Sequence, residues 1–337
     1  MSKRIGRRTA ALQTPPSVLS FANIGGRMEG QGPLAKYFDE LCEDSFFGEK
    51  TWEKAESAMQ KRVLQRALDQ AGLKPRELDC VLAGDLLNQC IGSSFGLRDF
   101  GIPFFGLYGA CSTMGESLAL AALLIDGGFA RLAAAQASSH FCTAERQYRM
   151  PVPYGNQRPP TAQWTATAAG CTILSAQGPG PYITHVTCGK IVDKGITDPN
   201  NMGAAMAPAA YDTLHAFFTD TKTSPADYDA IFTGDLGELG HAIVTDFFRQ
   251  DGIDMTKNYF DCGMLLYDRE KQDMHAGGSG CGCSAAVFNG YLLTGLKQGR
   301  WRRILFAPTG ALLSPTSSFQ GESIPGICHL VCVSTER

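Results

Sequence analysis

The sequence lacks the apolar segments that carry proteins into or across membranes. No apolar run reaches ~18 residues without a charged residue, which is the length that a spanning helix needs. The first residues, MSKRIGRR, contain no apolar stretch of the kind found in secretory signals. We therefore expect synthesis in the cytoplasm. The basic residues of this stretch suit an anionic membrane surface, although a solvated tail is the simpler interpretation.

The sequence also lacks an excess of charge and a regular cysteine pattern. Charged residues make up 19% of the 337 residues and the net charge is -3, so we expect a packed globular protein and no nucleic-acid partner. The twelve cysteines are irregularly spaced, and only Cys281 and Cys283 lie close together. Without a second pair at zinc-site spacing, we expect reduced thiols and no metal or cofactor. For this pair we favour close packing over a metal or redox role.

What the sequence does contain is an internal repeat. The stretch PRELDCVLAGDL (75–86) resembles PADYDAIFTGDL (225–236), and each copy follows a predicted helix and reads as a short apolar strand. Cys111-Ser112 and Cys283-Ser284 each precede a glycine and an arginine at equal spacing. We infer two related halves, residues 1–178 and 179–337, which join at the glycine- and proline-rich stretch AQGPGP.

Each half contains a helix that is apolar on nearly every side, over residues 117–125 and 285–296. A helix of this kind must be buried all round, so the two helices can cover each other. Apolar strands, 131–138 and 302–310, follow the helices directly, and this order favours parallel neighbours. The sequence therefore predicts an α/β protein with duplicated halves in five layers, α-β-α-β-α.

This architecture, with Cys111 at the start of a buried helix, resembles the thiolase fold. Nearly the whole chain is similar to the stage V sporulation protein AD family of spore-forming bacteria. The motifs that carry this similarity are EGQGPL (29–34), LAGDLLNQ (82–89), GACSTMGESLAL (109–120), ALLIDGGFA (122–130), SSHFCTAERQYR (138–149), GITDPNNMGAAMAPAA (195–210), GGSGCGCSA (277–285) and PTGALLSPTS (308–317).

The resemblance implies a binding component of the spore dipicolinic acid uptake machinery, without catalytic activity. It implies other membrane proteins of the same complex as partners, and peripheral association with the inner forespore or spore membrane. It also implies a homodimer, because proteins of this fold commonly pair sheets across a two-fold axis. The apolar stretch 103–110 is a candidate interface edge, and an internal core strand is the alternative.

Cys111 leaves a second function open, that of an acyl-transferring or condensing enzyme. The dipole of the following helix would favour a nucleophilic thiolate. Ketoacyl synthases of the thiolase fold place a histidine where Asp235 stands and an asparagine where Gly282 stands, and a thiolase-type Gly-His-Pro is absent here. The resemblance thus implies that the proton-transfer partners are missing. We expect Cys111 to line the floor of a ligand pocket; a purely structural scaffold is a third interpretation.

Dipicolinate is a planar ring with two carboxylates, so its site needs cationic donors, N–H groups and an apolar slot. The loop that follows the strand at 131–138 offers such groups, and a surface loop with paired arginines is the alternative. Asp85 and Asp235 end equivalent strands, and they suit calcium carried with the ligand, although we favour capping of the following helix or turn. For His275 we favour ordinary hydrogen bonds. The residues predicted to contact the ligand are Cys111, His140, Glu145, Arg146, Arg149, Tyr154, Asp85, Asn88, Asp235 and His275.

Overall fold

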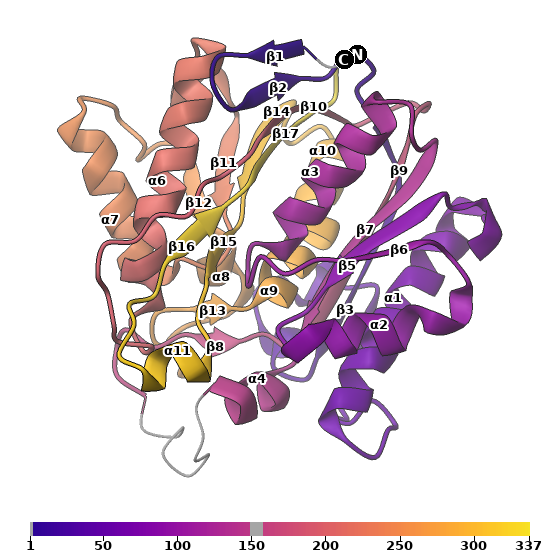
Figure 1. Ribbon diagram of the computed structural model, residues 1–337, viewed down its shortest axis with the longest axis horizontal. Helices are drawn as coiled ribbons and strands as arrows, with labels where there is room; N and C mark the ends of the chain where they lie inside the picture. Colours follow the sequence, from indigo (N-terminus) through magenta and orange to yellow (C-terminus); the bar gives the residue numbers. More distant parts are fainter. Residues whose placement is uncertain (1–2, 149–157) are drawn as a thin grey trace.

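The computed structural model describes residues 3–148 and 158–337, and it contains two five-stranded sheets of identical topology (Figure 1). The first sheet has the order β6 (Phe104–Gly106), β5 (Cys80–Gly84), β7 (Leu132–Ser139), β9 (Ala168–Ser175) and β3 (Ser17–Gly26). The second has the order β12 (Tyr259–Asp261), β11 (Ala230–Thr233), β14 (Arg303–Ala307), β17 (Leu330–Ser334) and β10 (Tyr182–Thr187).

Strand directions also match between the two sheets. In each sheet the first three strands are mutually parallel and the fourth is antiparallel to both of its neighbours. One pairing, Tyr182 with Ser17, joins β10 to β3 and so connects the sheets. The duplication that the sequence indicates is therefore present in the backbone. The exact boundary at residues 178 and 179 stays a prediction.

Helices fill the space between the sheets and cover their outer faces. The middle layer contains α3 (Thr113–Asp126), α9 (Cys281–Val287) and α10 (Leu293–Lys297), the last two joined by a π-helical turn (Phe288–Leu292). α1 (Trp52–Ala71) and α2 (Ile91–Leu97) cover the first sheet, while α6 (Met202–Thr221) and α7 (Gly237–Gln250) cover the second (Figure 1). The predicted five-layer α/β arrangement is confirmed.

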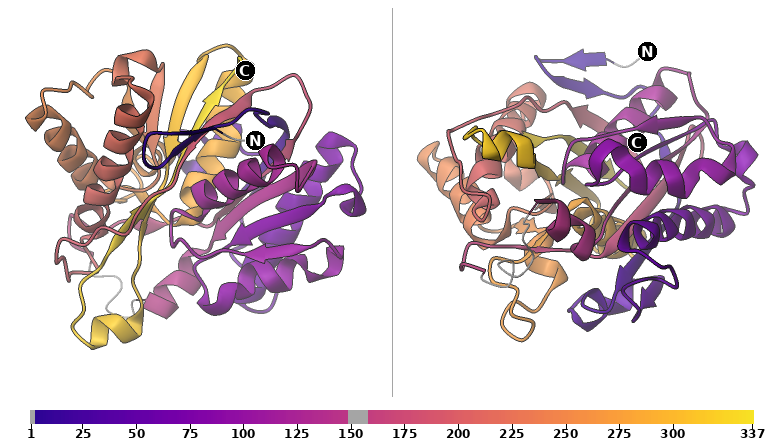
Figure 2. Two further views of the ribbon diagram at one scale, coloured as in Figure 1. Left: turned by 45° about the horizontal axis from the view of Figure 1, so that its top comes forward. Right: turned by 60° about the horizontal axis from the view of Figure 1, so that its bottom comes forward.

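Short elements complete the chain. The helices among them are α4 (Phe141–Tyr148), α8 (Cys262–Leu266) and α11 (Pro315–Phe319). The strands are β1 (Lys3–Ile5), β2 (Thr9–Ala11), β4 (Glu40–Cys42), β8 (Trp164–Thr165), β13 (Gly278–Ser279), β15 (Thr309–Ala311) and β16 (Gly326–Cys328). The β1–β2 hairpin lies at the end of the molecule that also holds both termini (Figure 2).

Local sequence explains where α1 begins and ends. The Thr51 hydroxyl accepts a hydrogen bond from the Lys54 amide at 3.3 Å, and Gly72 ends the helix in the left-handed conformation, with φ of 66°. The face that packs on the sheet carries Ala55, Met59, Val63 and Ala67, which are fully buried. These residues recur at intervals of four, as one buried face of a helix requires, so the helix predicted before the first repeat copy is present.

The stretch 103–110 is an edge and not an internal strand. Only Phe104–Gly106 forms a strand, β6, and it pairs with β5 alone. Phe104 and Phe105 are 40% and 49% exposed, and Tyr108 is 44% exposed. The apolar composition of this stretch therefore lies on the surface, next to the free edge of the first sheet.

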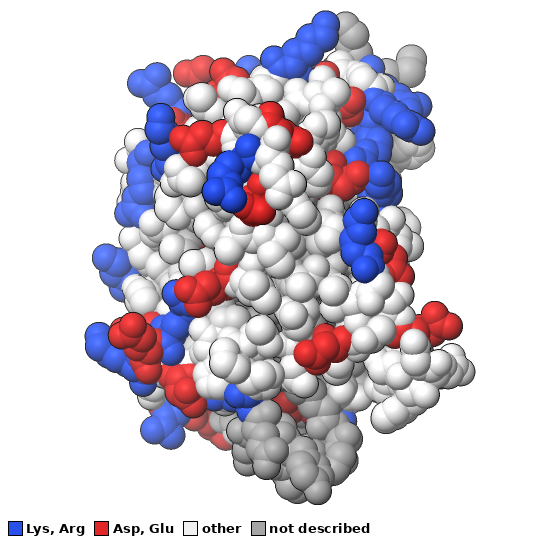
Figure 3. Space-filling model, turned by 90° about the vertical axis from the view of Figure 1, so that its left-hand side faces the viewer, with Lys and Arg blue, Asp and Glu red and all other residues white. Residues whose placement is uncertain are grey.

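Charge is distributed without a dominant sign on the face formed by α6 and α7, where basic and acidic side chains alternate around a broad uncharged area (Figure 3). Within the described ranges, no helix combines the length and the hydropathy that a membrane crossing requires.

Candidate functional site

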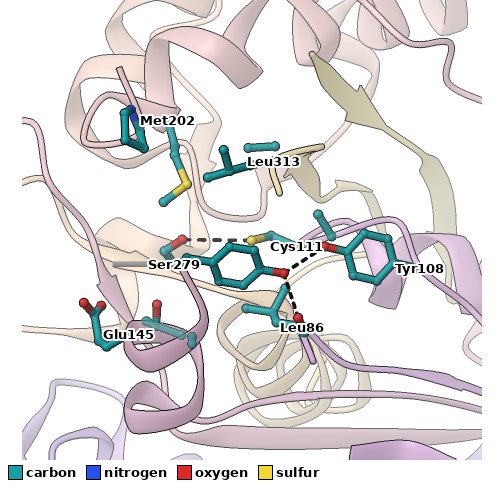
Figure 4. Close-up of a pocket in the computed structure, with 13 residues that line it drawn as sticks. Leu86, Tyr108, Cys111, Glu145, Met202, Ser279 and Leu313 are labelled. Atoms are coloured by element: carbon teal, nitrogen blue, oxygen red, sulfur yellow. Dashed lines mark hydrogen bonds between the residues drawn. The ribbon is translucent and has the colours of Figure 1, made fainter. Parts of the chain in front are cut away.

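A cavity lies between the two halves at the start of α3, where the sequence places Cys111 (Figure 4). Its volume of about 40 Å³ is below the range of about 300–1,000 Å³ that is usual for small-molecule sites, so the cavity in this conformation has room for only a few water molecules. Its lining is mainly apolar and comes from both halves of the chain. The lining residues are Leu86, Tyr108, Ala110, Cys111, Ala144, Glu145, Tyr148, Thr165, Pro199, Met202, Ser279, Ala311 and Leu313.

Two tyrosines form the aromatic wall of this cavity. The Tyr148 hydroxyl lies 2.9 Å from the Tyr108 hydroxyl and donates to the Leu86 carbonyl at 2.7 Å (Figure 4). These bonds fix both rings, because each polar tip is held while the ring stays against apolar neighbours. Tyr148 comes from α4 and Tyr108 from the segment after β6, so the wall joins the edge of the first sheet to the cavity.

Cys111 and Ser279 form the polar floor of the cavity, which we call the cavity floor. The Cys111 Sγ lies 4.0 Å from the Ser279 Oγ (Figure 4). Ala110, directly before Cys111, has a φ of 50°, a left-handed conformation that is unusual for a residue with a side chain. This sharp turn brings Cys111 to the start of the buried helix α3, as the sequence predicts.

Asp235 lies directly beneath the cavity floor and is fully buried. Its carboxyl group accepts hydrogen bonds from the Ser279 hydroxyl and the Gly280 amide, both at 3.1 Å, and from the Thr309 hydroxyl at 2.9 Å. The Cys111 thiol lies near enough for Asp235 to raise its pKa. Asp235 therefore joins separate segments of the second half beneath the cavity floor and acts electrostatically on Cys111 of the first.

This environment opposes a thiolate at Cys111. Burial raises the pKa of the thiol well above its ordinary value, and the adjacent Asp235 raises it further. Burial likewise raises the pKa of Asp235 to about 7. The helix dipole, from which the sequence predicts an activated thiolate, is thus outweighed by desolvation and by a neighbouring acid. The first backbone amides at the start of α3 are already bonded. Ser112 donates to the Gly109 carbonyl at 3.0 Å, and Thr113 donates to the Ala110 carbonyl at 3.3 Å.

The two aspartates that end equivalent strands have different roles. Asp85 accepts from the Leu87 amide at 2.9 Å and from the Ser93 amide at 2.7 Å, so it caps the turn and helix that follow, as we expected. Asp235 makes no such bond. The amides of Leu236 and Gly237 donate instead to Asp261, at 2.9 and 3.1 Å. Our capping interpretation of Asp235 is therefore wrong, because Asp261 on β12 has taken over that task.

Gly282, near the start of α9, has no room for a side chain. A Cβ atom at this position would lie 2.3 Å from the Ala168 carbonyl oxygen and 2.7 Å from the Ser139 amide nitrogen. Both contacts are with backbone, which cannot move aside cheaply. The asparagine that ketoacyl synthases are expected to carry here does not fit this packing.

Several predicted ligand contacts lie away from the cavity. His140 is buried, and its Nε2 lies 2.7 Å from the Ser45 carbonyl oxygen. The His275 Nδ1 lies 2.8 Å from the Pro159 carbonyl oxygen, and its Nε2 lies 3.1 Å from the Asp273 carboxylate. The prediction that His275 makes ordinary hydrogen bonds is confirmed. Asn88 is exposed, and its backbone N–H donates to the Gln147 side-chain oxygen at 3.1 Å.

The arginines with described positions are occupied elsewhere. Arg146 forms an ion pair with Glu53 and lies over the Trp52 ring. Arg158, from the same stretch, pairs with Asp273 at 3.0 Å and lies over Trp164. Arg149 and Tyr154 fall outside the described residues, so their contact with a ligand stays a prediction.

Of the predicted residues, the structure brings Cys111 and Glu145 into the cavity lining and Asp235 directly beneath it. Residues that the sequence did not point to are Ser279, Thr165, Met202 and Leu313, which reach the cavity from four separate segments. A usable signal existed for Ser279 alone, since it precedes the glycine-rich start of α9 that repeats the Cys111 region. Within the described ranges, no cluster of three His, Cys, Asp or Glu side chains could hold a metal ion.

Solved structures of condensing enzymes share this fold. 3-Oxoacyl-[acyl-carrier-protein] synthase III from Aquifex aeolicus matches with a TM-score of 0.59 and 12% identity, over 95% of this chain and 99% of that one. Human mitochondrial 3-ketoacyl-CoA thiolase in complex with CoA matches with a TM-score of 0.57 and 12% identity, over 96% and 99%. Cerulenin-bound OleA from Xanthomonas campestris matches with a TM-score of 0.60 and 13% identity, over 96% of this chain and 97% of that one. The protein therefore has a thiolase-like fold, and at this identity the likeness leaves its activity open.

Sequence comparison defines the family within that fold. The profile of stage V sporulation protein AD matches residues 6–334. Stage V sporulation protein AD of Bacillus subtilis (strain 168) is 44% identical over 328 residues, which cover 97% of this chain and 96% of that protein. The chain belongs to the stage V sporulation protein AD family, and its role is in sporulation.

Proposed function

We propose that this protein is a non-catalytic binding component of dipicolinic acid uptake during sporulation, and that the ligand occupies the cavity above Cys111. The observation that carries the proposal is the lining of the cavity. It is mainly apolar, and the rings of Tyr108 and Tyr148 line one wall. A planar aromatic acid suits such a lining once side chains of the wall move to enlarge the cavity, with its ring against the tyrosines and a carboxylate toward the hydroxyl of Ser279 or Thr165.

The chemistry of the cavity floor supports binding more than catalysis. Claisen condensation needs a nucleophilic thiolate and a group that moves protons. Here the pKa of Cys111 is raised well above its ordinary value, and the described residues that line the cavity include no histidine, lysine or arginine. Asp235, at the place where a condensing enzyme is expected to carry histidine, raises the pKa of the thiol further.

Calorimetric titration of the full chain with dipicolinate, alone and with equimolar calcium, tests the proposal. We expect saturable binding at one site per chain. Replacing Tyr148 with Ala should weaken it about tenfold, because an aromatic contact contributes about 0.5–1.5 kcal/mol beyond its buried area. Tyr211→Ala is the matched control, since Tyr211 lies on α6 and bonds to Asp251 away from the cavity. Absence of saturable binding in both titrations would remove the proposal.

An acyl-transferring enzyme is the second candidate, and the shared fold with ketoacyl synthases and thiolase favours it. Incubation with acyl-CoA of several chain lengths, followed by intact mass measurement, separates the two. Binding without catalysis predicts an unmodified chain. A mass increase that matches the acyl group and maps to Cys111 would instead establish the enzyme.

We also propose that two copies pair along the edge strand β6, with the uptake complex holding the protein at the inner forespore or spore membrane. The edge carries unpaired backbone groups, and Phe104, Phe105 and Phe95 of α2 are all exposed beside it. Phe105→Lys should convert a dimer to a monomer in analytical sedimentation. Phe319→Lys, which alters an even more exposed phenylalanine on α11, should leave the dimer intact.

A further inference from the structure

The polar groups of the cavity floor meet one buried acid, Asp235. The Ser279 hydroxyl donates to Asp235 at 3.1 Å, and the Cys111 Sγ lies 4.0 Å from the Ser279 Oγ. The Gly280 amide and the Thr309 hydroxyl also donate to Asp235, at 3.1 and 2.9 Å. Three donors therefore converge on a single side chain that is fully buried.

This convergence determines what the cavity floor can offer to a ligand. An ionised carboxylate only accepts hydrogen bonds, so the Ser279 hydroxyl hydrogen must point down toward Asp235 and away from the cavity. A ligand carboxylate would then meet the lone pairs of Ser279, which repel it. One proton on Asp235 makes it a donor to the Ser279 oxygen, and the hydroxyl hydrogen of Ser279 is released to donate upward.

The titratable groups around Asp235 change their own charge little, so the charge of this region depends mainly on whether Asp235 holds a proton. The titratable side chains that act on it or feel its charge are Cys111 before α3, Cys281 and Cys283 on α9, Asp261 and Cys262 at the β12–α8 junction, and Cys328 on β16. Burial raises the pKa of each of these thiols, so they stay neutral. Burial also raises the pKa of Asp261, which adds negative charge beside Asp235 whenever it is ionised. On the cavity side the wall adds Glu145.

From this geometry we infer that Asp235 couples ligand binding to protonation: a proton bound at Asp235 turns Ser279 into a hydrogen-bond donor, and a carboxylate ligand is held in that state. The inference rests on the proposed function and adds a positioning residue that never touches the ligand. It predicts that binding of dipicolinate takes up about one proton when Asp235 is ionised beforehand.

The pH dependence of dipicolinate affinity tests the coupling. Between about pH 6 and about pH 8.5, where ordinary carboxylates stay ionised, the wild-type affinity should fall by up to about tenfold per pH unit in the upper part of the range. Asp235→Asn should give a flat profile, because its amide donates to Ser279 at every pH. Glu145→Gln is the matched control for the other acid of the cavity and should keep the wild-type slope.

A second measurement needs no variant. Calorimetry of the wild-type chain at about pH 8, in buffers of different ionisation enthalpy, should report uptake of about one proton on binding. Ser279→Ala should bind more weakly at low pH and lose the pH dependence. A flat wild-type profile, or an unchanged slope in a folded Asp235→Asn variant, would overturn the inference while leaving dipicolinate binding in place. Absence of saturable binding at every pH removes the proposed function itself, and this inference with it.

Discussion

Asp85 and Asp235 occupy equivalent positions in two sheets of identical topology, but they bond to different parts of the chain. Asp85 bonds to amides within eight residues of itself and closes its own half. Asp235 accepts hydrogen bonds from Ser279, Gly280 and Thr309, all contributed from later in the chain, and it raises the pKa of Cys111 in the other half. A duplicated residue has thus kept its identity while its contacts changed from local to long-range.

The same contrast separates the entrances of the two buried helices. Before α3, Ala110 turns sharply and leaves Cys111 beside open space. At the equivalent place in the second half, Gly282 lies within α9 and is pressed against β9. One helix start opens onto the cavity and the other is sealed by packing. The open entrance is the one at which we propose that the ligand binds.

The largest expected effect comes from forcing a side chain into the sealed entrance. Gly282→Ala should lower the free energy of unfolding by about 3 kcal/mol or more, because its Cβ would meet two backbone groups of the first sheet. The midpoint and slope of urea unfolding measure this loss. Ala110→Gly is the matched control from the first half. It relieves a left-handed alanine and should change stability by no more than about 1 kcal/mol. Equal losses in the two variants would contradict the contrast.

The sequence predicted the architecture because the repeat and the apolar helices are local signals. It predicts a helix before the first repeat copy, the strands after both middle helices, and Cys111 at the start of a buried helix. It did not separate Asp85 from Asp235, since the partners of Asp235 lie more than forty residues away. The sequence predicts Arg146 and His140 as ligand contacts because they follow a strand and offer polar donors. Their actual partners, Glu53 and Ser45, are supplied by the packing of a distant segment.

A smaller effect should separate the two aspartates. Asp85→Ala leaves the buried amides of Leu87 and Ser93 without an acceptor, so it should cost about 2–3 kcal/mol of unfolding free energy. The folded variant should keep its dipicolinate affinity, because Asp85 does not line the cavity. Asp235→Ala should reverse this order, with a clear loss of affinity. Denaturant unfolding and calorimetry on both variants give the comparison, and a folded Asp85→Ala chain that no longer binds would refute the local role.

A pH-dependent effect should mark the buried acid of the first half. Burial, with Asp85 nearby, raises the pKa of Glu56 to about 8, so the folded state keeps a proton that the unfolded chain has lost. The contribution of Glu56 to the free energy of unfolding is fully present below pH 4.5, the ordinary pKa of a glutamate. It falls as the pH rises and levels off above about pH 8. Glu56→Gln cannot ionise, so thermal unfolding of this variant should lose less between about pH 7 and about pH 8.5 than wild type.

The control for this measurement is Glu49→Gln, because Glu49 is exposed and its charge lies in water. Its pH profile should follow the wild type. The Thr143 hydroxyl of α4 donates to Glu56 at 2.8 Å, so ionisation of Glu56 acts on the helix that carries Tyr148. A wild-type profile that stays level between neutral and alkaline pH would show that Glu56 is already ionised in the folded protein.

The smallest effect concerns the two repeated cysteines. Cys111 and Cys283 are 6% and 0% exposed, and burial raises both pKa values well above the ordinary thiol. Iodoacetamide at neutral pH should therefore modify the exposed Cys188 first and leave both in the folded chain. Cys111→Ala should cost about 0.5 kcal/mol and Cys283→Ala about 1 kcal/mol, because the first borders a cavity and the second is packed on all sides. Rapid, stoichiometric labelling of Cys111 would reveal a thiolate and shift the assignment of the cavity toward acyl transfer.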